Sequence, residues 1–314
     1  MAVSIKDVAK HAGVSVGTVS NALNRPEEVS AETLARVLDS VDALGYVRND
    51  AARRLRAGVS STVGFVVLDG QNPFFNEVVR GAEDEASKHG IAVLVGNTDE
   101  DPVREGMYLD LFEEQRVRGV LIAPYGDITR RLRQLRERGI PAVLVDRMNV
   151  EGTFSSVATD SVVGGRMAAE HLLAIGRRRL AVEASDVDAE IEVIATRALT
   201  VEEGAAAGRK LLERPVAQRP DALFAANDLV ALGLLQGLVV DGAMLVPEQM
   251  ALIGFDDIAF AAAAAVPISS VRQPSRAIGA TALRVLLEES GDDSLIPRQT
   301  VFRPELVVRA STGA

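Results

Sequence analysis

The chain has 314 residues, a hydrophobic content of 47% and a net charge of −10, and it is long enough for a small module beside one large or two medium cores. It has no run of 18 or more apolar residues and begins without a basic region followed by an apolar core, so we expect no membrane span, no signal peptide and a cytoplasmic location. The sequence contains no cysteine, which excludes disulfides. Its three histidines, His11, His89 and His171, are too scattered to suggest a metal cluster, and we expect no cofactor.

The first part of the chain differs in charge from the rest. Up to Thr62 there are eight basic and seven acidic residues, whereas the remainder carries 26 basic and 37 acidic ones. Because an acidic body repels nucleic acid, any surface that binds nucleic acid would have to be local.

Three short helices are predicted before residue 46. Ser4, Ser15 and Ser30 are in position to cap them, and Gly13 and Gly45 are natural stops for the first and third. Their apolar positions are Ile5, Val8, Ala9 and Ala12, then Val19, Ala22 and Leu23, and finally Leu34, Val37, Leu38, Val41 and Leu44. We expect one small core between the three helices.

The first two helices are separated by a short turn that contains Gly13, which is the arrangement of a helix-turn-helix. The second helix can enter a major groove. Its outer face carries Val16, Gly17, Ser20 and Asn21: Gly17 permits close approach to DNA, and Asn21 can pair with a base edge. The hydroxyl groups that can reach phosphates are those of Ser15, Thr18 and Ser20. A plain three-helix bundle remains the alternative.

Residues 49–58, NDAARRLRAG, have the composition of a segment that folds on a partner. Asn49 or Asp50 can cap one or two helical turns that contain Arg53 and the single large apolar residue Leu55, before Gly58 ends them. Isolated helices this short are marginal. Arginines around one exposed leucine suit a minor-groove contact, with the leucine inserted at a base step. A solvated linker is the alternative interpretation.

The segment SIKDVAKHAGVSVGTVSNALNRPEEVSAETLARVLDSVDALGYVRNDAARRLRAG resembles the DNA-binding head and hinge of the lactose-repressor (LacI/GalR) family of bacterial transcription regulators. The resemblance implies that Val16, Gly17 and Asn21 read bases, that Ser15, Thr18 and Asn49 lie at the DNA backbone, and that Leu55 is the intercalating hinge residue. Many relatives have arginine in place of Asn21, so the resemblance does not imply an operator sequence.

After residue 62, short apolar runs alternate with amphipathic segments, which is typical of parallel strands joined by crossover helices. The first series is 63–68, 91–96, 119–123 and 141–145, and the second is 179–184, 221–227 and 250–255, followed by ISSVRQ and ELVVR. We therefore expect an α/β core of two doubly wound lobes.

Polar and aromatic residues follow the strands of both series. Ligands of doubly wound sheets bind outside the carboxyl ends of the strands. The candidates at those ends are Asn72, Phe74, Phe75, Asp146, Arg147, Asn227, Asp256 and Gln273. Amides, carboxylates and a guanidinium can bind vicinal hydroxyls while aromatic faces pack on sugar C–H groups, so they predict a polyol pocket. Taken singly, Asn227 could cap a helix and Phe75 could belong to the core.

The strings NPFFNEVVRGAEDEA, RGVLIAP, IPAVLVDR, FAANDLVALG and IGFDDIAF resemble the sensor core of the same family, which is similar to periplasmic sugar-binding proteins. The resemblance implies a homodimer with two lobes around a small-molecule effector site. It also implies allosteric coupling of that site to an operator in double-stranded DNA. We assign residues 1–58 to the head and hinge and residues 59–314 to the effector-binding and dimerisation core.

The pattern breaks near residues 184–191. Only SDVDAE separates the run at 179–184 from IEVIA at 191–195, and a parallel crossover needs a dozen or more residues. The two runs should therefore not be successive parallel strands joined by an ordinary βαβ unit. By comparison with the family pattern, about 25 residues are missing, close to one βα element of a roughly 30-residue unit. Relatives place an arginine that contacts the effector in this region, and many have phenylalanine in place of Leu199. We expect a reduced cleft wall, and apolar surface at Leu180 and Val182 without cover.

Taken together, the sequence predicts a repressor that binds a pseudo-palindromic operator as a dimer and responds to a small effector, most simply a sugar. A sugar-binding protein without a role on DNA is the alternative. An enzyme is disfavoured, because no Ser/His/Asp arrangement, phosphate loop or paired acid–base spacing stands out and no residue is assigned a catalytic role.

Overall fold

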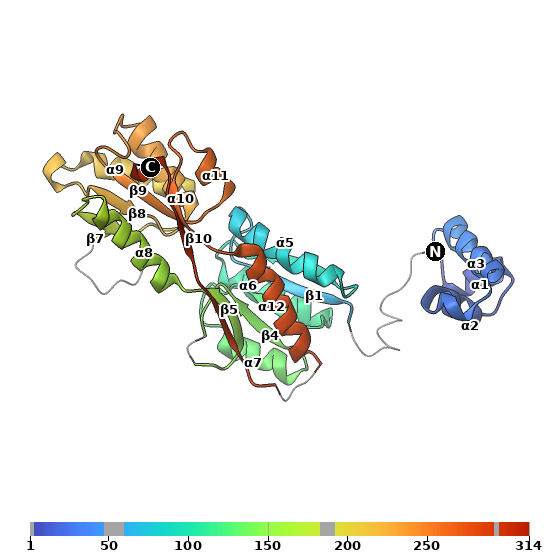
Figure 1. Cartoon of the computed structure of the whole chain (residues 1–314). Helices are drawn as coiled ribbons and strands as arrows, with labels where there is room; N and C mark the ends of the chain where they lie inside the picture. Colours follow the sequence, from blue (N-terminus) through green and yellow to red (C-terminus); the bar gives the residue numbers. More distant parts are fainter. Residues whose placement is uncertain (1–2, 47–59, 150, 183–191, 292–294, 314) are drawn as a thin grey trace. The chain divides into compact units, whose positions relative to one another are not determined.

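A computed structural model describes residues 3–46, 60–149, 151–182, 192–291 and 295–313 (Figure 1). The chain divides into two compact units, Met1–Val59 and Ser60–Ala314. Each unit has its own buried apolar cluster, and each is described separately below.

The first unit contains helices α1 (Ile5–Ala12), α2 (Val16–Asn24) and α3 (Ala31–Leu44), with a 3-10 turn at Pro26–Glu28. The predicted caps form: the Asp7 carboxylate accepts from the Ser4 backbone N–H, and Ser15 Oγ accepts from the backbone N–H of Thr18. Gly13 and Gly45 end their helices at positive φ, 66° and 59°, which glycine adopts without strain. The core of the unit is centred on Val8, Val19 and Val37, each with no exposed surface.

The second unit contains two six-stranded sheets, one in each lobe. The first sheet has the order β11-β5-β4-β3-β1-β2, and all of its pairs are parallel. Its strands are β1 (Thr62–Val67), β2 (Ala92–Asn97), β3 (Val120–Ile122), β4 (Ala142–Val145), β5 (Ser155–Thr159) and β11 (Gln299–Phe302). The second sheet has the order β12-β10-β9-β8-β6-β7, in which only the pair β10–β12 is antiparallel. Its strands are β6 (Leu180–Val182), β7 (Glu192–Val193), β8 (Ala222–Phe224), β9 (Ala251–Asp256), β10 (Ser269–Arg272) and β12 (Glu305–Val307).

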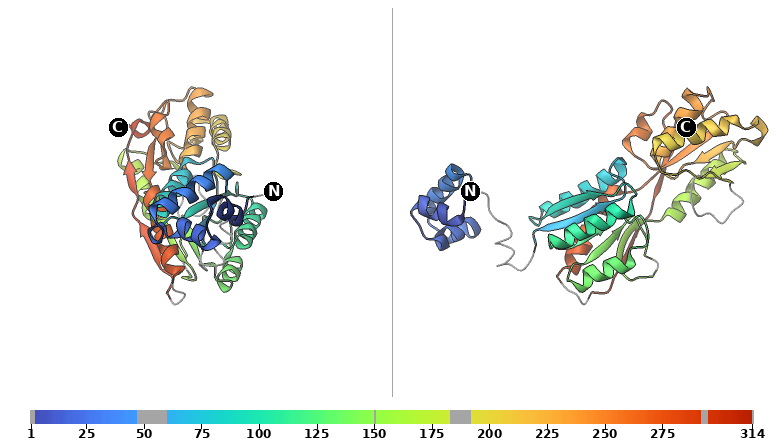
Figure 2. Two further views of the ribbon diagram at one scale, coloured as in Figure 1. Left: turned by 90° about the vertical axis from the view of Figure 1, so that its right-hand side faces the viewer. Right: turned by 180° about the vertical axis from the view of Figure 1, so that it is seen from behind.

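Helices cover both faces of each sheet, because parallel strands are apolar on both sides. In the first lobe, α5 (Pro73–Ser87) and α12 (Ser275–Glu289) pack on one face, and α6 (Pro102–Glu114) and α7 (Thr129–Glu137) pack on the other (Figure 2, right-hand view). In the second lobe, α9 (Val201–Glu213) and α10 (Asp228–Leu235) lie on one face and α8 (Ser161–Ala174) on the other. The short α11 (Ala259–Ala263) follows β9, and a single π-helical turn, Gln236–Val240, follows α10.

The chain passes between the lobes more than once. Strands β1 to β5 belong to the first sheet and β6 to β10 to the second, after which β11 returns to the first and β12 to the second. Helix α12 therefore packs against α5 although about 190 residues separate them (Figure 1). This repeated crossing places the carboxyl ends of strands from both lobes at one boundary.

The two apolar runs on either side of 185–190 pair with each other as parallel strands. The expectation that no ordinary βαβ unit joins them stays a prediction, because the connecting residues are not described. Residues Ala181 and Val182 of β6 lie in parallel register with Glu192 and Val193 of β7. The hydrogen-bonded strands are shorter than the apolar runs, which leaves nine residues, 183–191, to connect them. An extended chain of that length spans about 30 Å, enough to return along so short a pair. That connection lies outside the described residues.

The expectation that the strand at 180–182 loses its apolar cover is wrong for Leu180. This side chain is half-buried and packs against a cluster that includes Leu172 of α8 and Ile253 of β9. Helix α8 therefore covers Leu180 on this face of the sheet. The side chain of Val182 lies outside the described residues.

Two pairs of helices approach each other closely through glycine. A Cβ atom on Gly279 of α12 would lie 1.8 Å from the Val78 carbonyl oxygen of α5, and one on Gly81 would lie 2.1 Å from the Arg276 carbonyl oxygen. In the second lobe, a Cβ on Gly233 of α10 would lie 2.0 Å from the carbonyl oxygen of Val201. These backbones touch where any side chain would separate them.

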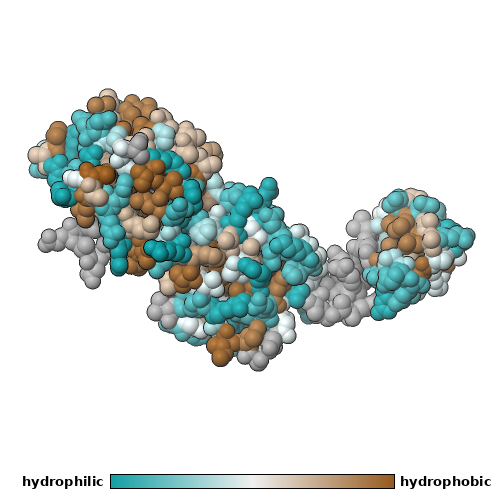
Figure 3. All heavy atoms as spheres, in the orientation of Figure 1, coloured by the Kyte–Doolittle hydropathy of each residue, from teal (hydrophilic) through white to brown (hydrophobic). Residues whose placement is uncertain are grey.

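Among the described residues, no helix is both long and apolar enough to cross a membrane. On the face drawn in Figure 3, hydrophilic and hydrophobic residues are interspersed over the surface. The described residues also contain no group of three or more His, Asp or Glu side chains arranged to hold a metal ion.

We expect Gly279→Ala to lower the free energy of unfolding by about 1–3 kcal/mol, because the new methyl group forces α5 and α12 apart. Gly106→Ala in α6 is the matched control. A Cβ there meets no atom within 4 Å, so this substitution should be neutral or stabilising by about 0.5–1 kcal/mol. Guanidinium unfolding followed by circular dichroism compares the two variants, and equal midpoints would contradict the close helix contact.

Candidate effector cleft and DNA-contact helix

Helix α2 presents the predicted DNA-contact face to solvent. Val16 is 39% exposed, and Gly17 and Asn21 are also exposed. Their neighbours on the inner face, Val19 and Ala22, are buried in the head core. The helical period therefore separates a packing face from an outer face within nine residues.

The predicted phosphate contacts lie at the start of the same helix. Ser15 Oγ is 3.0 Å from the Thr18 backbone nitrogen and 2.9 Å from Thr18 Oγ1, so both hydroxyls take part in the cap. Ser20 is half-buried one turn further along. A Cβ on Gly17 would lie 3.6 Å from Ser15 Oγ, an ordinary contact, so the fold of the head does not itself require glycine there. The other predicted DNA contacts, Asn49, Arg53 and Leu55, lie outside the described residues.

A cavity of about 200 Å³ lies among the ends of strands from both lobes. Its lining residues are Leu68, Asp69, Asn72, Phe74, Phe75, Glu100, Asp146, Ser161, Leu199, Ala226, Asn227, Phe255, Asp256 and Gln273. Seven of the eight residues that the sequence placed at the effector site are among them. We call this cavity, together with a second cavity that shares Asp69 and Glu100 with it and is described below, the cleft.

Asp256 is the central polar group of the cavity. It is 8% exposed, and its carboxylate oxygens accept hydrogen bonds from Asn72 Nδ2 at 3.2 Å and from Gln273 Nε2 at 2.8 Å. Asn72 comes from the first lobe and Gln273 from the end of β10 in the second, so Asp256 links the lobes. Burial raises the pKa of Asp256 to about 7, and the neighbouring charge of Asp146 adds to the rise.

Asp146 follows β4 and faces the same space. Burial of its carboxyl group raises the pKa of Asp146 to about 7, and the opposing effects of Arg147 and Gln273 are smaller. Two carboxyl groups in one cavity resist ionising together, because each charge disfavours the other. At neutral pH the pair is poised to hold or release a proton.

A third carboxyl group stands behind the cavity. Asp228 has no exposed surface; it accepts hydrogen bonds from Ser270 Oγ at 2.7 Å and from the Ile258 backbone N–H at 2.8 Å. Burial, followed by the charge of Asp256, raises the pKa of Asp228 to about 8. A Cβ at Gly254 would lie 2.0 Å from Asp228 Oδ1, so this glycine makes room for the acid. Sequence reasoning missed Asp228, which directly follows the predicted residue Asn227.

The amides of the cavity also have structural roles. Asn72 Oδ1 accepts from the Phe74 backbone N–H and caps α5, and Asn227 Oδ1 accepts from the Val230 backbone N–H and caps α10. Asn227 Nδ2 donates to the Leu199 carbonyl oxygen at 3.1 Å. The capping role considered for Asn227 and its position on the cavity wall therefore coexist.

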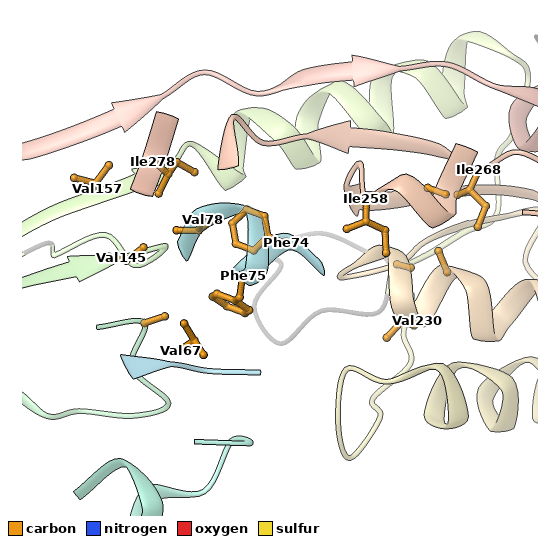
Figure 4. Close-up of a cluster of buried hydrophobic side chains, with 14 of the residues drawn as sticks. Val67, Phe74, Phe75, Val78, Val145, Val157, Val230, Ile258, Ile268 and Ile278 are labelled. Carbon is orange, nitrogen blue, oxygen red and sulfur yellow. The ribbon is translucent and has the colours of Figure 1, made fainter. Parts of the chain in front are cut away.

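Phe74 and Phe75 belong to the core of the first lobe as well as to the cavity wall. Their rings meet edge to face with centroids 5.1 Å apart, and they are 3% and 5% exposed. Figure 4 shows Phe75 above Val67 and Phe74 beside Val78. Only small parts of these rings are left to contact a ligand.

Arg147 is the predicted effector residue that does not line the cavity. Its Nη2 donates to the Pro124 carbonyl oxygen at 3.2 Å, and its side chain lines a different cavity with Thr129 and Phe154. Asp146 has φ of 56°, and successive side chains at the end of a strand point to opposite sides. Adjacent residues therefore reach different cavities.

The most informative residues that sequence reasoning missed are Asp69 and Glu100. They follow β1 and β2, so the rule that ligands bind at the carboxyl ends of strands would have found them. Both also line a second cavity of about 240 Å³, together with Gln71, Asp99, Ala198, Thr200, Val201, Glu202 and Leu229. Leu199, noted as a departure from the family, lies on the wall of the first cavity and is 36% exposed.

Each of the two units contains a segment that matches a known protein family. Residues 4–49 match the family model "Bacterial regulatory proteins, lacI family", and residues 161–312 match the model "Periplasmic binding protein-like domain". The HTH-type transcriptional repressor PurR of Aliivibrio fischeri strain MJ11 is 31% identical, with 98% of each chain aligned. The HTH-type transcriptional regulator DegA of Bacillus subtilis is 30% identical over 100% of this chain and 99% of its own.

Solved structures give the same result. A complex of the transcriptional regulator CelR with cellobiose has a TM-score of 0.70 at 30% identity and covers 98% of this chain and 99% of its own. A lac repressor dimer bound to operator and the anti-inducer ONPF has the same fold, with a TM-score of 0.84, 24% identity and full coverage of both chains. The protein belongs to the lacI family of bacterial regulatory proteins. It is a DNA-binding transcription regulator, modulated by a small molecule, and not an enzyme.

The carboxyl groups of the cleft should make the second unit less stable as pH rises. The folded state retains protons on Asp146, Asp228 and Asp256 that the unfolded chain releases near pH 4, so the stability they contribute is complete below pH 4 and is lost as pH rises to about 8. We expect Asp256→Asn to reduce this loss, measured as the difference in urea midpoint between pH 5 and pH 8.5. Asp84→Asn, at an exposed position in α5, is the control and should keep the wild-type difference. A wild-type difference in Asp256→Asn would contradict the assignment.

Proposed function

We propose that this regulator acts in the cytoplasm as a homodimeric repressor that places α2 of each subunit in the major groove of a pseudo-palindromic operator. The observation that carries the proposal is the exposed outer face of α2. The absence of a side chain at Gly17 permits close approach to DNA, and the amide of Asn21 can hydrogen-bond to a base edge. The related lac repressor structure is described as a dimer bound to operator.

The proposed DNA contacts divide by role. Val16, Gly17 and Asn21 meet base edges, whereas Ser15, Thr18 and Ser20 approach phosphates. Asn49, Arg53 and Leu55 are proposed to act in a hinge segment, with Leu55 inserted at a base step. These last three residues are assigned from the sequence alone. We assign residues 1–58 to the DNA-binding head and hinge, and residues 59–314 to effector binding and dimerisation.

We propose that the effector binds in the cleft between the lobes. Asn72, Asp146, Asp256 and Gln273 would form its polar contacts, and the exposed edges of Phe74 and Phe75 its apolar ones. Asn227 would act chiefly by holding the wall, since both ends of its amide are engaged. A carbohydrate is the class favoured by this mixture, and the related CelR structure is a cellobiose complex.

We further propose that this chain lacks one βα segment near residues 184–191. The alignment with the Aliivibrio repressor runs over 331 positions, whereas 98% of 314 residues is about 308, so about 23 positions have no counterpart here. That number is close to one βα element of a roughly 30-residue βαβ unit. The pairing of β6 with the two-residue β7 is consistent with a direct connection in its place.

The first experiment is selection of bound genomic DNA fragments by the purified full-length protein. We expect a palindromic site whose affinity falls steeply with salt, because phosphate contacts release counterions. A flat salt response, or no enrichment of any sequence, would leave only a small-molecule binding protein without a role on DNA.

Asn21→Ala tests the base-reading role of α2. We expect this variant to lose about 1–3 kcal/mol of binding free energy for the selected site and little for random DNA. Leu38→Ala truncates a partly exposed side chain of α3 and is the matched control, expected to bind as the wild type does. Fluorescence anisotropy with both DNAs gives the comparison, and equal losses in the two variants would refute a specific contact by Asn21.

A further inference from the structure

The cleft is lined by carboxylates without a basic residue. Its two cavities share Asp69 and Glu100, which makes them one continuous lining. The acidic residues that line them are Asp69, Asp99, Glu100, Asp146, Glu202 and Asp256. Among the described lining residues there is no lysine, arginine or histidine.

The arginines nearest to the cleft in the chain have other partners. Arg147 donates to a backbone carbonyl in a separate cavity. Arg197 is 90% exposed at its side chain and forms an ion pair with Glu203 at 2.6 Å. The charge of Arg147 lowers the pKa of Asp146 by less than burial raises it, and neither arginine lines the cleft.

The donor groups on the side chains that line the cavity around Asp256 are the amides of Asn72, Asn227 and Gln273 and the Ser161 hydroxyl, and the carboxylate oxygens outnumber them. The side-chain nitrogens of Asn72, Asn227 and Gln273 each donate to a protein oxygen. In contrast, the Gln273 oxygen Oε1 is buried without a hydrogen-bond partner among the described residues, on a side chain that is only 6% exposed. An unpartnered buried acceptor costs stability, and a donor on a bound ligand would satisfy it. This acceptor lies on the wall of the cavity.

These groups set the chemistry of an occupant. A hydroxyl group supplies one donor and brings two lone pairs that need donors in return, whereas an ammonium group supplies three donors and no acceptor. Burial raises the pKa values of Asp146 and Asp256 to about 7, so a positive charge beside them would favour their ionised forms at neutral pH. An ammonium group would supply that charge together with donors for the acceptor oxygens of the cavity.

We propose that the effector is a hydroxylated molecule that carries a protonated amine, of the amino sugar class, with the ammonium group between Asp146, Asp256 and Gln273 Oε1. This inference rests on the effector-binding role proposed above and names the ligand class. The hydroxyl groups would donate to Asp69 and Glu100.

The mixed lining of the cleft favours a sugar framework over an extended polyamine. The acidic residues of the cavity follow β1, β2 and β4 or end β9, and the apolar residues Leu68, Phe74 and Phe255 line the same cavity. A compact ring that carries several donors and also has C–H faces matches this mixture of acidic and apolar groups.

The test uses matched pairs of glucose with glucosamine, galactose with galactosamine and mannose with mannosamine. Titration calorimetry with the full chain at constant ionic strength should show one aminated member bound about tenfold or more tightly than its neutral partner. Equal or tighter binding of the neutral partners would overturn the proposal. Failure of every aminated sugar to bind at millimolar concentration would also overturn it.

Asp146→Asn removes one charge beside the proposed ammonium site while keeping the shape of the side chain. The advantage of the aminated sugar over its neutral partner should fall at least several-fold in this variant, with a smaller loss in affinity for the neutral partner. Glu100→Gln at the other end of the cleft should weaken both sugars alike. Asp84→Asn removes an equal charge from the exposed face of α5 and should leave both affinities unchanged. A loss in Asp84→Asn equal to that in Asp146→Asn would mean that net charge alone sets the preference.

The calorimetric titrations, read together with the DNA selection, distinguish failure of the ligand proposal from failure of the DNA-binding proposal. If the selected operator responds to a neutral compound that binds in the cleft, the regulator remains and the amino sugar proposal is wrong. If an aminated sugar binds while no DNA sequence is enriched, the ligand class holds and the DNA-binding proposal fails.

Discussion

The contact of Asp256 with Asn72 and Gln273 is the interaction on which the cleft depends. Asn72 lies 184 residues away in the other lobe, whereas Gln273 lies 17 residues away in the same lobe as Asp256. A buried carboxylate costs free energy unless it is hydrogen-bonded, and the bond from Asn72 exists only while the lobes keep their present positions. Any ligand that enters must replace or extend these bonds. The pocket and the relation of the lobes are therefore set by the same few atoms.

The surrounding packing makes such a buried acidic group tolerable. Asp228 is held by Ser270 and the Ile258 N–H, and the missing side chain at Gly254 leaves space for it. On the outer faces, helices meet backbone to backbone at Gly279 and Gly233, which gives both lobes dense cores close to the cleft. Asp256 and Asp228 thus lie within a strand and a helix, β9 and α10. Groups on such elements are positioned more precisely than groups on loops.

Apolar periodicity in the sequence predicted most strands of both sheets, but it did not predict β5 and β11. In β5, the buried Ser155 and Ser156 are satisfied by Glu289 and Gln299, so polar residues are tolerated there. Strand β11 lies at the edge of its sheet and alternates exposed with half-buried residues, so it has no continuous apolar run. The rule of strand ends gathered seven of eight candidate residues on one cavity wall. It could not separate Asp146 from Arg147, since adjacent residues at a strand end diverge.

The sequence by itself determined the two units, the three-helix head with its capped α2, the repeated strand and helix alternation, and the family to which the chain belongs. These features rest on local signals such as caps, glycine stops and apolar period, which need no distant partner. Only the tertiary structure decided that β6 and β7 pair across 183–191 and that Leu180 keeps its cover under α8. It also decided that the cleft collects acids and leaves Gln273 Oε1 without a partner. These outcomes depend on chain crossings and on side chains from distant segments, and the order of residues along the chain does not specify which of them meet.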